Sequence, residues 1–197
     1  MLLLHDQKLA IMTPPKCATN SLHAGLRCPP WNGETFVGPS PAVESGCDRH
    51  INAWPHEAKR YKKLVVVRDP LTRLVSLYLH WANRLAGYGR AAASFGDFVG
   101  LVVAGGGFGE GMATPMYAWN LSRWLADVES DGVLRAETLM ADLAAHGIER
   151  QHELPQLNQS YRGQDYGAFY TPELLERAQP WALPDCDRFG YEWAGDA

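Results

Sequence analysis

The chain has 197 residues, 46% of them hydrophobic, and a formal net charge of −4. This length suits one sizeable core, so we expect a single domain over residues 1–197. A mildly acidic chain is not suited to general nucleic-acid or membrane binding, because those partners attract basic surfaces. Any anionic ligand must therefore be held by a few well-placed cations.

The N-terminus and the cysteines favour a cytoplasmic protein without a metal. Residues 2–4 are three leucines, too few for a signal-peptide core. No later stretch reaches the roughly 20 apolar residues that span a membrane. The four cysteines have no CxxC spacing, which argues against a zinc ribbon or redox dithiol. Reduced thiols are the simpler interpretation, with a disulfide as the alternative.

In chain order, the first predicted elements are a strand at residues 8–13 and the start of a helix at residues 19–26. Residues 28–46 are rich in proline and glycine and indicate a long irregular loop, a kind of loop that is often functional. The β-branched run at residues 64–67 predicts a second strand, covered on both faces as in a parallel sheet.

The following elements are mostly helical. Asp69 and Pro70 predict the start of a long helix that stops at Gly87. We expect another helix at residues 95–103, a strand running into a helix that stops near residue 147, and a short late helix capped by Thr171. Because strands alternate with helices, we predict a three-layer α/β fold with a central parallel sheet flanked by helices.

The stretch "TPPKCATNSL" places a lysine at the mouth of a strand-to-helix turn. A helix N-terminus presents N–H groups and a partial positive charge, so it favours an anion. Lys16 adds a full charge, and Thr19, Asn20 and Ser21 add short side-chain donors. We predict a phosphate cradle that is not a Walker loop, which needs G-x-x-x-x-G-K-[ST]. The alternative is a solvated lysine before an ordinary capped helix.

The stretch "VVVRDPLTRLVS" carries a second polar group of residues. Arg68 follows the second predicted strand, so we expect it at the sheet edge that holds Lys16. Arg73 and Ser76 are three residues apart and share a helix face, which we expect to lie opposite the helix's apolar stripe. An arginine at a strand end and a serine on the next helix can grip one phosphate. Alternatively, Arg68 caps a sheet edge and Arg73 is a solvated charge.

Together the two stretches resemble motifs of sulfotransferases, in particular the carbohydrate-type, family-2-like members. The first is similar to their 5′-phosphosulfate loop, usually written PKxGTT. The second is similar to their 3′-phosphate motif, R-[DN]-P-x-x-R-x-x-S-x-Y, with every fixed position present from Arg68 to Tyr78. The segments "LRAETL", "ELPQLNQS" and "DCDRFGY" resemble later family segments in the same order. Ala18 and Asn20 depart from the usual glycine and threonine, which leaves open an inactive site.

The resemblance implies a P-loop-like fold and the donor 3′-phosphoadenosine-5′-phosphosulfate (PAPS). Its sulfuryl group would pass to a hydroxyl or amine of a small-molecule or glycan acceptor, without a metal. Lys16 would neutralise charge on the leaving phosphate oxygen. Arg68 and Ser76 would bind the 3′-phosphate, and Arg162 would add a contact to the nucleotide. The implied 5′-phosphate contacts come from Lys16, Cys17, Ala18, Thr19, Asn20 and Ser21.

An acceptor hydroxyl also needs a base, which the family usually supplies from between the two motifs. The candidates here are Glu44, His50, His56 and Glu57. We favour His50, because "RHINA" resembles an H-x-t-A segment of related enzymes. Neutral imidazole suits this role near pH 7.

Two other functions remain open. A nucleotide-dependent kinase of a related fold is disfavoured by the missing GK[ST] and by the lack of an evident magnesium carboxylate. A non-catalytic nucleotide-binding protein is suggested by the altered loop at Ala18 and Asn20. The sequence indicates neither the acceptor nor the oligomeric state.

Overall fold

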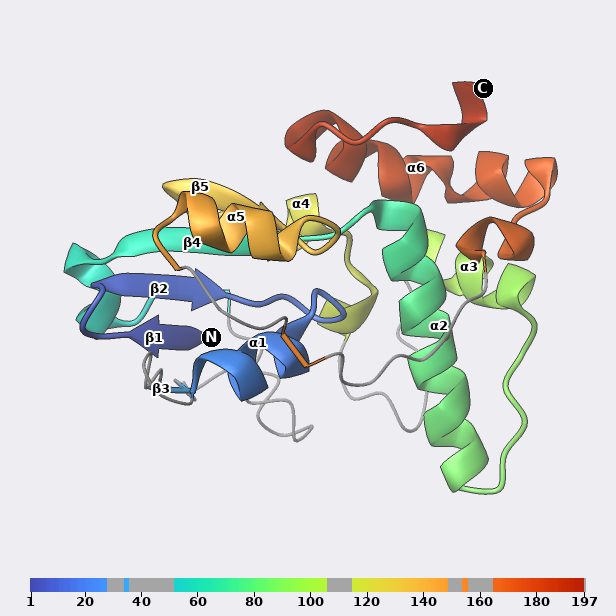
Figure 1. Cartoon of the computed structure of the whole chain (residues 1–197). Coiled ribbons are helices and arrows are strands. Elements are labelled where there is room, and N and C mark those ends of the chain that lie inside the picture. The colour runs from blue at the N-terminus through green and yellow to red at the C-terminus, as the bar shows by residue number, and fades with distance from the viewer. Residues whose placement is uncertain (28–33, 36–51, 106–114, 149–153, 156–164, 197) are drawn as a thin grey trace. The chain divides into compact units, whose positions relative to one another are not determined.

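The computed structural model describes residues 1–27, 34–35, 52–105, 115–148, 154–155 and 165–196. It divides into two compact units, each made of two chain segments (Figure 1). The first unit comprises Met1–Arg68 and Leu125–Asn158, and the second comprises Asp69–Trp124 and Gln159–Ala197. The single domain predicted from the chain length stays a prediction. The long loop predicted at residues 28–46 lies almost wholly outside the described residues.

The first unit is built on a five-stranded sheet in the order β3-β1-β2-β4-β5. Strands β2, β4 and β5 are parallel, and Ile11, Leu64 and Gly132 are aligned across them. This confirms that the strands predicted at residues 8–13 and 64–67 are parallel neighbours. The strands are β1 (Leu2–Leu4), β2 (Leu9–Met12), β3 (Glu34–Thr35), β4 (Lys62–Val67) and β5 (Gly132–Arg135).

The sheet is mixed, whereas a parallel sheet was predicted. Strand β1 runs antiparallel to β2, and β3 runs antiparallel to β1. Only residues 5–8 connect β1 to β2, where the amide of Lys8 donates to the carbonyl of His5 at 3.1 Å. A connection this short allows only an antiparallel hairpin, because parallel neighbours need a crossover of a dozen residues or more.

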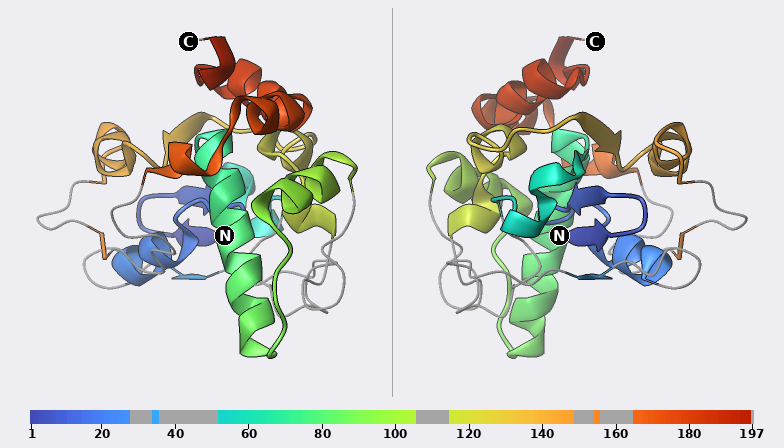
Figure 2. Two further views of the ribbon diagram at one scale, coloured as in Figure 1. Left: turned by 90° about the vertical axis from the view of Figure 1, so that its right-hand side faces the viewer. Right: turned by 90° about the vertical axis from the view of Figure 1, so that its left-hand side faces the viewer.

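Two helices of the first unit, α1 (Thr19–Leu26) and α5 (Leu139–Ala145), lie on the same side of its sheet (Figure 2). Each follows the carboxyl end of a strand, α1 after β2 and α5 after β5. The side chains of Leu22 and Leu26 are fully buried, as is all of β2. The described residues thus form a mixed α/β unit, and the predicted three-layer arrangement stays a prediction.

The second unit is helical, and aromatic rings form much of its core. The ring of Tyr78 lies 5.3 Å from that of Phe95 and 5.4 Å from that of Phe98, and the Trp81 ring lies 5.5 Å from that of Phe98. Among the described residues, no helix is long and apolar enough to cross a membrane. The α-helices of this unit are α2 (Pro70–Gly87), α3 (Phe95–Val103), α4 (Leu121–Trp124) and α6 (Pro172–Phe189), and the 3₁₀ turns are η3 (Pro115–Ala118), η4 (Tyr166–Phe169) and η5 (Ala194–Asp196).

The predicted helix caps are confirmed. The Asp69 carboxylate accepts from the amide of Thr72 at 2.7 Å, with Pro70 as the first helical residue. The Thr171 hydroxyl accepts from the amide of Leu174 at 3.3 Å. A helix N-terminus leaves its first amides without intrahelical partners, so these oxygens define where α2 and α6 begin.

Candidate nucleotide site

The turn between β2 and α1 has the backbone shape of an anion site. Lys16 and Ala18 have φ values of 65° and 55°, in the left-handed region that residues with a Cβ rarely adopt. Left-handed residues at alternate positions turn successive N–H groups toward one concavity. No side chain caps the start of α1, and its first turn carries no acidic residue. The positive end of this helix is therefore suited to an anion.

Two residues of the turn bond to its own backbone. The hydroxyl of Thr19 donates to the carbonyl of Pro14 at 3.3 Å, and the amide of Cys17 donates to the same carbonyl at 3.2 Å. The Cys17 side chain is fully buried. Of the six predicted 5′-phosphate residues, these two therefore help to shape the turn. Asn20 and Ser21 lie half-buried in the first turn of α1.

Lys16 and Arg68 lie at the same edge of the sheet, as predicted. Each residue follows the carboxyl end of its strand, and those strands, β2 and β4, are parallel neighbours. The Nη1 atom of Arg68 donates to the backbone carbonyl of Lys16 at 3.3 Å. Ligands of open α/β sheets bind at this carboxyl edge. The structure thus brings two of the predicted cations together where a ligand is expected.

The ammonium group of Lys16 has an unusual environment. Burial, followed by the neighbouring charge of Arg68, lowers the pKa of Lys16 from 10.5 to about 8, and Cys17 opposes this shift. A phosphate beside these two cations would favour the charged lysine and so raise that pKa again. Strongly perturbed pKa values are frequent at functional sites. The electrostatics therefore agree with the backbone in indicating an anion site.

The other predicted site residues lie either outside the described residues or in the second unit. His50, Arg162 and Glu44 lie outside the described residues. Ser76 is buried, with 6% of its surface exposed, and it belongs to the second unit. Arg68 belongs to the first unit, so its pairing with Ser76 on one phosphate stays a prediction.

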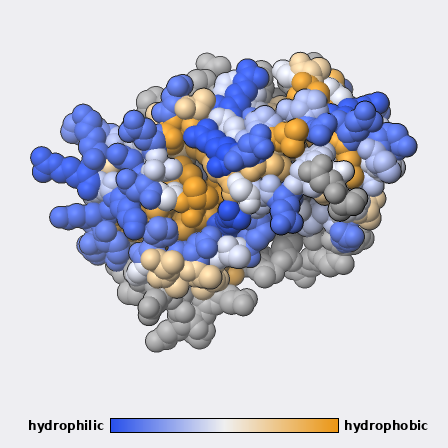
Figure 3. Space-filling model, turned by 90° about the horizontal axis from the view of Figure 1, so that it is seen from above, coloured by the Kyte–Doolittle hydropathy of each residue, from blue (hydrophilic) through white to orange (hydrophobic). Residues whose placement is uncertain are grey.

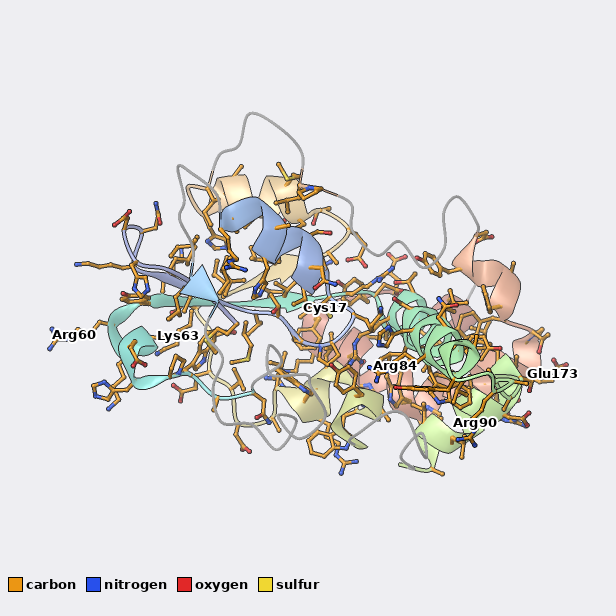
Figure 4. The ribbon with its side chains drawn as sticks, turned by 90° about the horizontal axis from the view of Figure 1, so that it is seen from below. Cys17, Arg60, Lys63, Arg84, Arg90 and Glu173 are labelled. Atoms are coloured by element: carbon orange, nitrogen blue, oxygen red, sulfur yellow. The ribbon has the colours of Figure 1, made fainter. Side chains whose placement is uncertain are left out.

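The alternative bases His56 and Glu57 lie at the opposite end of the sheet from Lys16. They are in the 3₁₀ turn η2 (His56–Arg60), which precedes β4, whereas Arg68 follows β4. The six extended residues of β4 separate its two ends by about 20 Å. Figure 4 shows Arg60 at this far end, well away from Cys17. Neither candidate base is placed to act at the Lys16 turn.

The far end of the first unit is strongly hydrophilic. Figure 3 shows polar side chains projecting there. Trp54 also lies at this end, because its indole N–H donates to the carbonyl of Glu129 at 2.6 Å, shortly before β5 begins. Trp54 therefore has a structural contact away from the Lys16 turn. The exposed residues of this end include His56, Glu57, Lys59, Arg60 and Lys62.

Comparison with known proteins finds a similarity to one protein family. A family model described as "Sulfotransferase family" matches residues 46–101. The match confirms the resemblance to sulfotransferases. The matched segment contains the motif from Arg68 to Tyr78 and leaves out the turn at Lys16. No curated protein and no solved structure matches the chain.

Arg73, the second arginine of the motif from Arg68 to Tyr78, is part of the core of the second unit. Arg73 was expected on a face of the helix opposite its apolar stripe, but it is fully buried. Its Nη1 atom donates to the carbonyl of Trp119 at 3.0 Å, and its guanidinium lies 5.5 Å from the ring centre of Trp181. The prediction was wrong because α2 is packed on more than one side, since Ser76 and Leu77 are also buried.

Sequence reasoning missed Asp185, which helps to organise the second unit. Its carboxylate oxygens accept from the amides of Leu121 and Ser122 at 2.8 and 2.6 Å. Burial raises the pKa of Asp185, and the charge of Arg73 opposes that rise. The available signal was the family-like segment "DCDRFGY", in which Asp185 is the first residue. This segment and the sulfotransferase motif thus meet in the core of one unit.

The described ranges contain no group of three or more His, Cys, Asp or Glu residues that could hold a metal ion. The described cysteines, Cys17 and Cys186, are both buried free thiols. Burial, with the neighbouring carboxylates, raises the pKa of Cys186 to about 11, which keeps it protonated near neutral pH.

Proposed function

We propose that this protein is a sulfotransferase that moves a sulfuryl group from PAPS to an acceptor hydroxyl or amine, on a P-loop-like fold. The observation that carries the proposal is the juxtaposition of Lys16 and Arg68. Lys16 lies in an uncapped left-handed turn, and Arg68 bonds to its carbonyl. Arg68 also opens the motif that the sulfotransferase model matches. One edge of the sheet therefore combines an anion-binding turn with a sulfotransferase motif.

The proposed reaction makes one bond to sulfur and breaks another. The acceptor oxygen bonds to sulfur as the bond from sulfur to the 5′-phosphate oxygen breaks, which releases 3′,5′-ADP. Lys16 stabilises the charge that grows on the leaving oxygen. His50 takes the acceptor proton. The donor is held by the Lys16 turn at its 5′-phosphate, by Arg68 and Ser76 at its 3′-phosphate, and by Arg162.

The acceptor class is a small molecule or a glycan. A carbohydrate is favoured by the likeness of "ELPQLNQS" to a segment of carbohydrate-type sulfotransferases.

The experiment that tests the proposed function is transfer of labelled sulfate from PAPS into a panel of glycans, lipids and small alcohols. Thermal shifts with 3′,5′-ADP and ATP accompany it, because they distinguish the sulfotransferase from the kinase.

We expect 3′,5′-ADP to raise the melting temperature more than ATP does, and label to enter at least one acceptor. Lys16→Met should lower turnover by about 10²–10³, the usual effect of removing one preorganised donor to the transition state. The matched control is Lys59→Met, an exposed lysine in η2 at the far end of the sheet. Binding of 3′,5′-ADP without any transfer would support a nucleotide-binding protein, and binding of ATP alone would support a kinase.

A further inference from the structure

We propose that Arg68 is a positioning residue for the Lys16 turn. Its hydrogen bond to the Lys16 carbonyl holds the turn in its anion-binding shape, so that binding of the 5′-phosphate also depends on Arg68. This inference rests on the proposed function, which gives Arg68 only the 3′-phosphate. It makes one side chain a physical link between the two phosphate subsites.

The turn needs such support because its backbone is strained. Lys16 and Ala18 both have positive φ values, although neither is a glycine. For a residue with a Cβ, the left-handed conformation costs about 1–2 kcal/mol. Bonds to the carbonyl of Pro14 hold Cys17 and Thr19. Between them and the strand, the guanidinium of Arg68 holds the carbonyl of Lys16 itself, at 3.3 Å.

Arg68 is well anchored for this role. It follows β4, which is paired with β2 on one side and β5 on the other. The preceding residue, Val67, accepts from the amide of Ala136 through its carbonyl at 2.9 Å, which fixes the end of the strand. A guanidinium has five N–H donors in a rigid plane, so it can serve a carbonyl and a phosphate at once.

The placement of Arg68 beside Lys16 brings two positive charges together, and the resulting shift in the pKa of Lys16 can be measured. After burial, the charge of Arg68 is the next largest cause that lowers the pKa of Lys16. A residue that merely supported the fold would not need to bring a second cation toward a half-buried lysine. An anion at the turn offsets the repulsion between the two cations, so the arrangement is more favourable with phosphate bound than without it.

The first test measures binding of 5′-AMP, which has no 3′-phosphate, by calorimetry. Arg68→Ala should weaken this binding by about tenfold, the lower end of the effect of a charged hydrogen bond. The matched control is Arg60→Ala, which removes the same charge from an exposed site at the far end of the sheet. If Arg68 touched only the 3′-phosphate, Arg68→Ala would weaken binding of 3′,5′-ADP and leave that of 5′-AMP at the wild-type level.

The second test needs no ligand and therefore does not depend on sulfate transfer. In folded Arg68→Ala, hydrogen exchange at the Cys17 amide should become faster, because the turn loses its support. The pKa of Lys16, measured by NMR, should rise above about 8. Arg68→Lys keeps a charge but lacks the planar guanidinium, so it should speed exchange with a smaller rise in that pKa.

The two tests separate failure of this inference from failure of the proposed function. Faster exchange with weaker 5′-AMP binding supports the positioning role, even if no acceptor receives sulfate. Unchanged exchange at Cys17 in a folded Arg68→Ala or Arg68→Lys protein overturns it, whatever the nucleotide affinities. If the wild-type protein binds 5′-AMP, an unchanged 5′-AMP affinity in Arg68→Ala overturns it equally.

Discussion

At the scale of single residues, the backbone of Ala18 is strained, because its φ is positive although it is not a glycine. The family-like motif usually has glycine here, but Ala18 still adopts the left-handed conformation, with φ 55° and ψ 19°. The turn therefore keeps the shape that glycine would favour, at the expense of stability.

Ala18→Gly should raise the free energy of unfolding by about 1 kcal/mol, because glycine has no steric penalty in the left-handed region. The matched control is Ala24→Gly, at an exposed position inside α1, the helix that Ala18 precedes. There the substitution should lower the free energy of unfolding by about 0.5–1 kcal/mol. Urea denaturation of both variants measures these changes in the free energy of unfolding. A loss of stability in Ala18→Gly would mean that the turn is not strained at this residue.

Lys16 gives a second prediction at this scale, for the pH dependence of nucleotide binding. Its pKa in the free protein is lowered to about 8. A bound phosphate favours the charged form, so this pKa is higher in the complex and binding takes up a proton above pH 8. The affinity for 3′,5′-ADP should therefore be level just below pH 8. Above pH 8 it should fall by up to about tenfold per pH unit.

Calorimetry in buffers of different ionisation enthalpy measures both the affinity and the proton uptake. Lys16→Met should bind more weakly at pH 7 and should lack the fall above pH 8, because methionine does not titrate. If the wild-type and Lys16→Met proteins show the same fall, another group is responsible and Lys16 does not contact the phosphate.

At the scale of elements, Asp185 joins α6 to the start of α4. Its carboxylate accepts two amide N–H groups and lies near the buried charge of Arg73. Asp185→Ala should lower the free energy of unfolding by about 1–3 kcal/mol, because it leaves the buried amides of Leu121 and Ser122 without their acceptor. Asp187→Ala, at an exposed position of the same helix, should change it by less than about 0.5 kcal/mol. Equal effects in urea denaturation would show that Asp185 has no special role.

Local signals predicted several elements well. The bounds of α1 and α3 agree with those expected from apolar spacing, and Asp69 and Thr171 cap the helices that they were expected to cap. The late helix α6 is longer than predicted and continues past Pro180 and Pro184. Its extension depends on distant residues, because side chains of Asn120 and Ser122 donate to carbonyls of α6. Such tertiary bonds leave no local trace in the sequence.

At the scale of the whole molecule, the same distinction applies to the candidate site. The shared edge of Lys16 and Arg68 was predictable, because the carboxyl ends of neighbouring parallel strands lie together. The buried position of Arg73 and the bond from Arg68 to the Lys16 carbonyl were not predictable. Both depend on which side chains pack around a helix or a turn, and this is decided by residues far apart in the chain.

The proposed reaction needs a base as well as the Lys16 turn, and the proposed base, His50, lies outside the described residues. We expect His50→Ala to lower turnover by about 10²–10⁴ while 3′,5′-ADP still binds, as for the loss of one general base. In the wild type the rate should fall in acid, because imidazolium cannot accept the acceptor's proton.

The control for His50 is His56→Ala. His56 is exposed and precedes β4, at the end of the sheet away from Lys16, so its removal should leave turnover within about twofold. Sulfate-transfer rates and 3′,5′-ADP affinities of both variants show which histidine, if either, acts as the base. A large loss in His56→Ala with none in His50→Ala would place the chemistry at the opposite end of the sheet and would contradict the site at Lys16. If neither variant loses turnover but Glu44→Gln does, the base lies in the predicted segment and is a carboxylate.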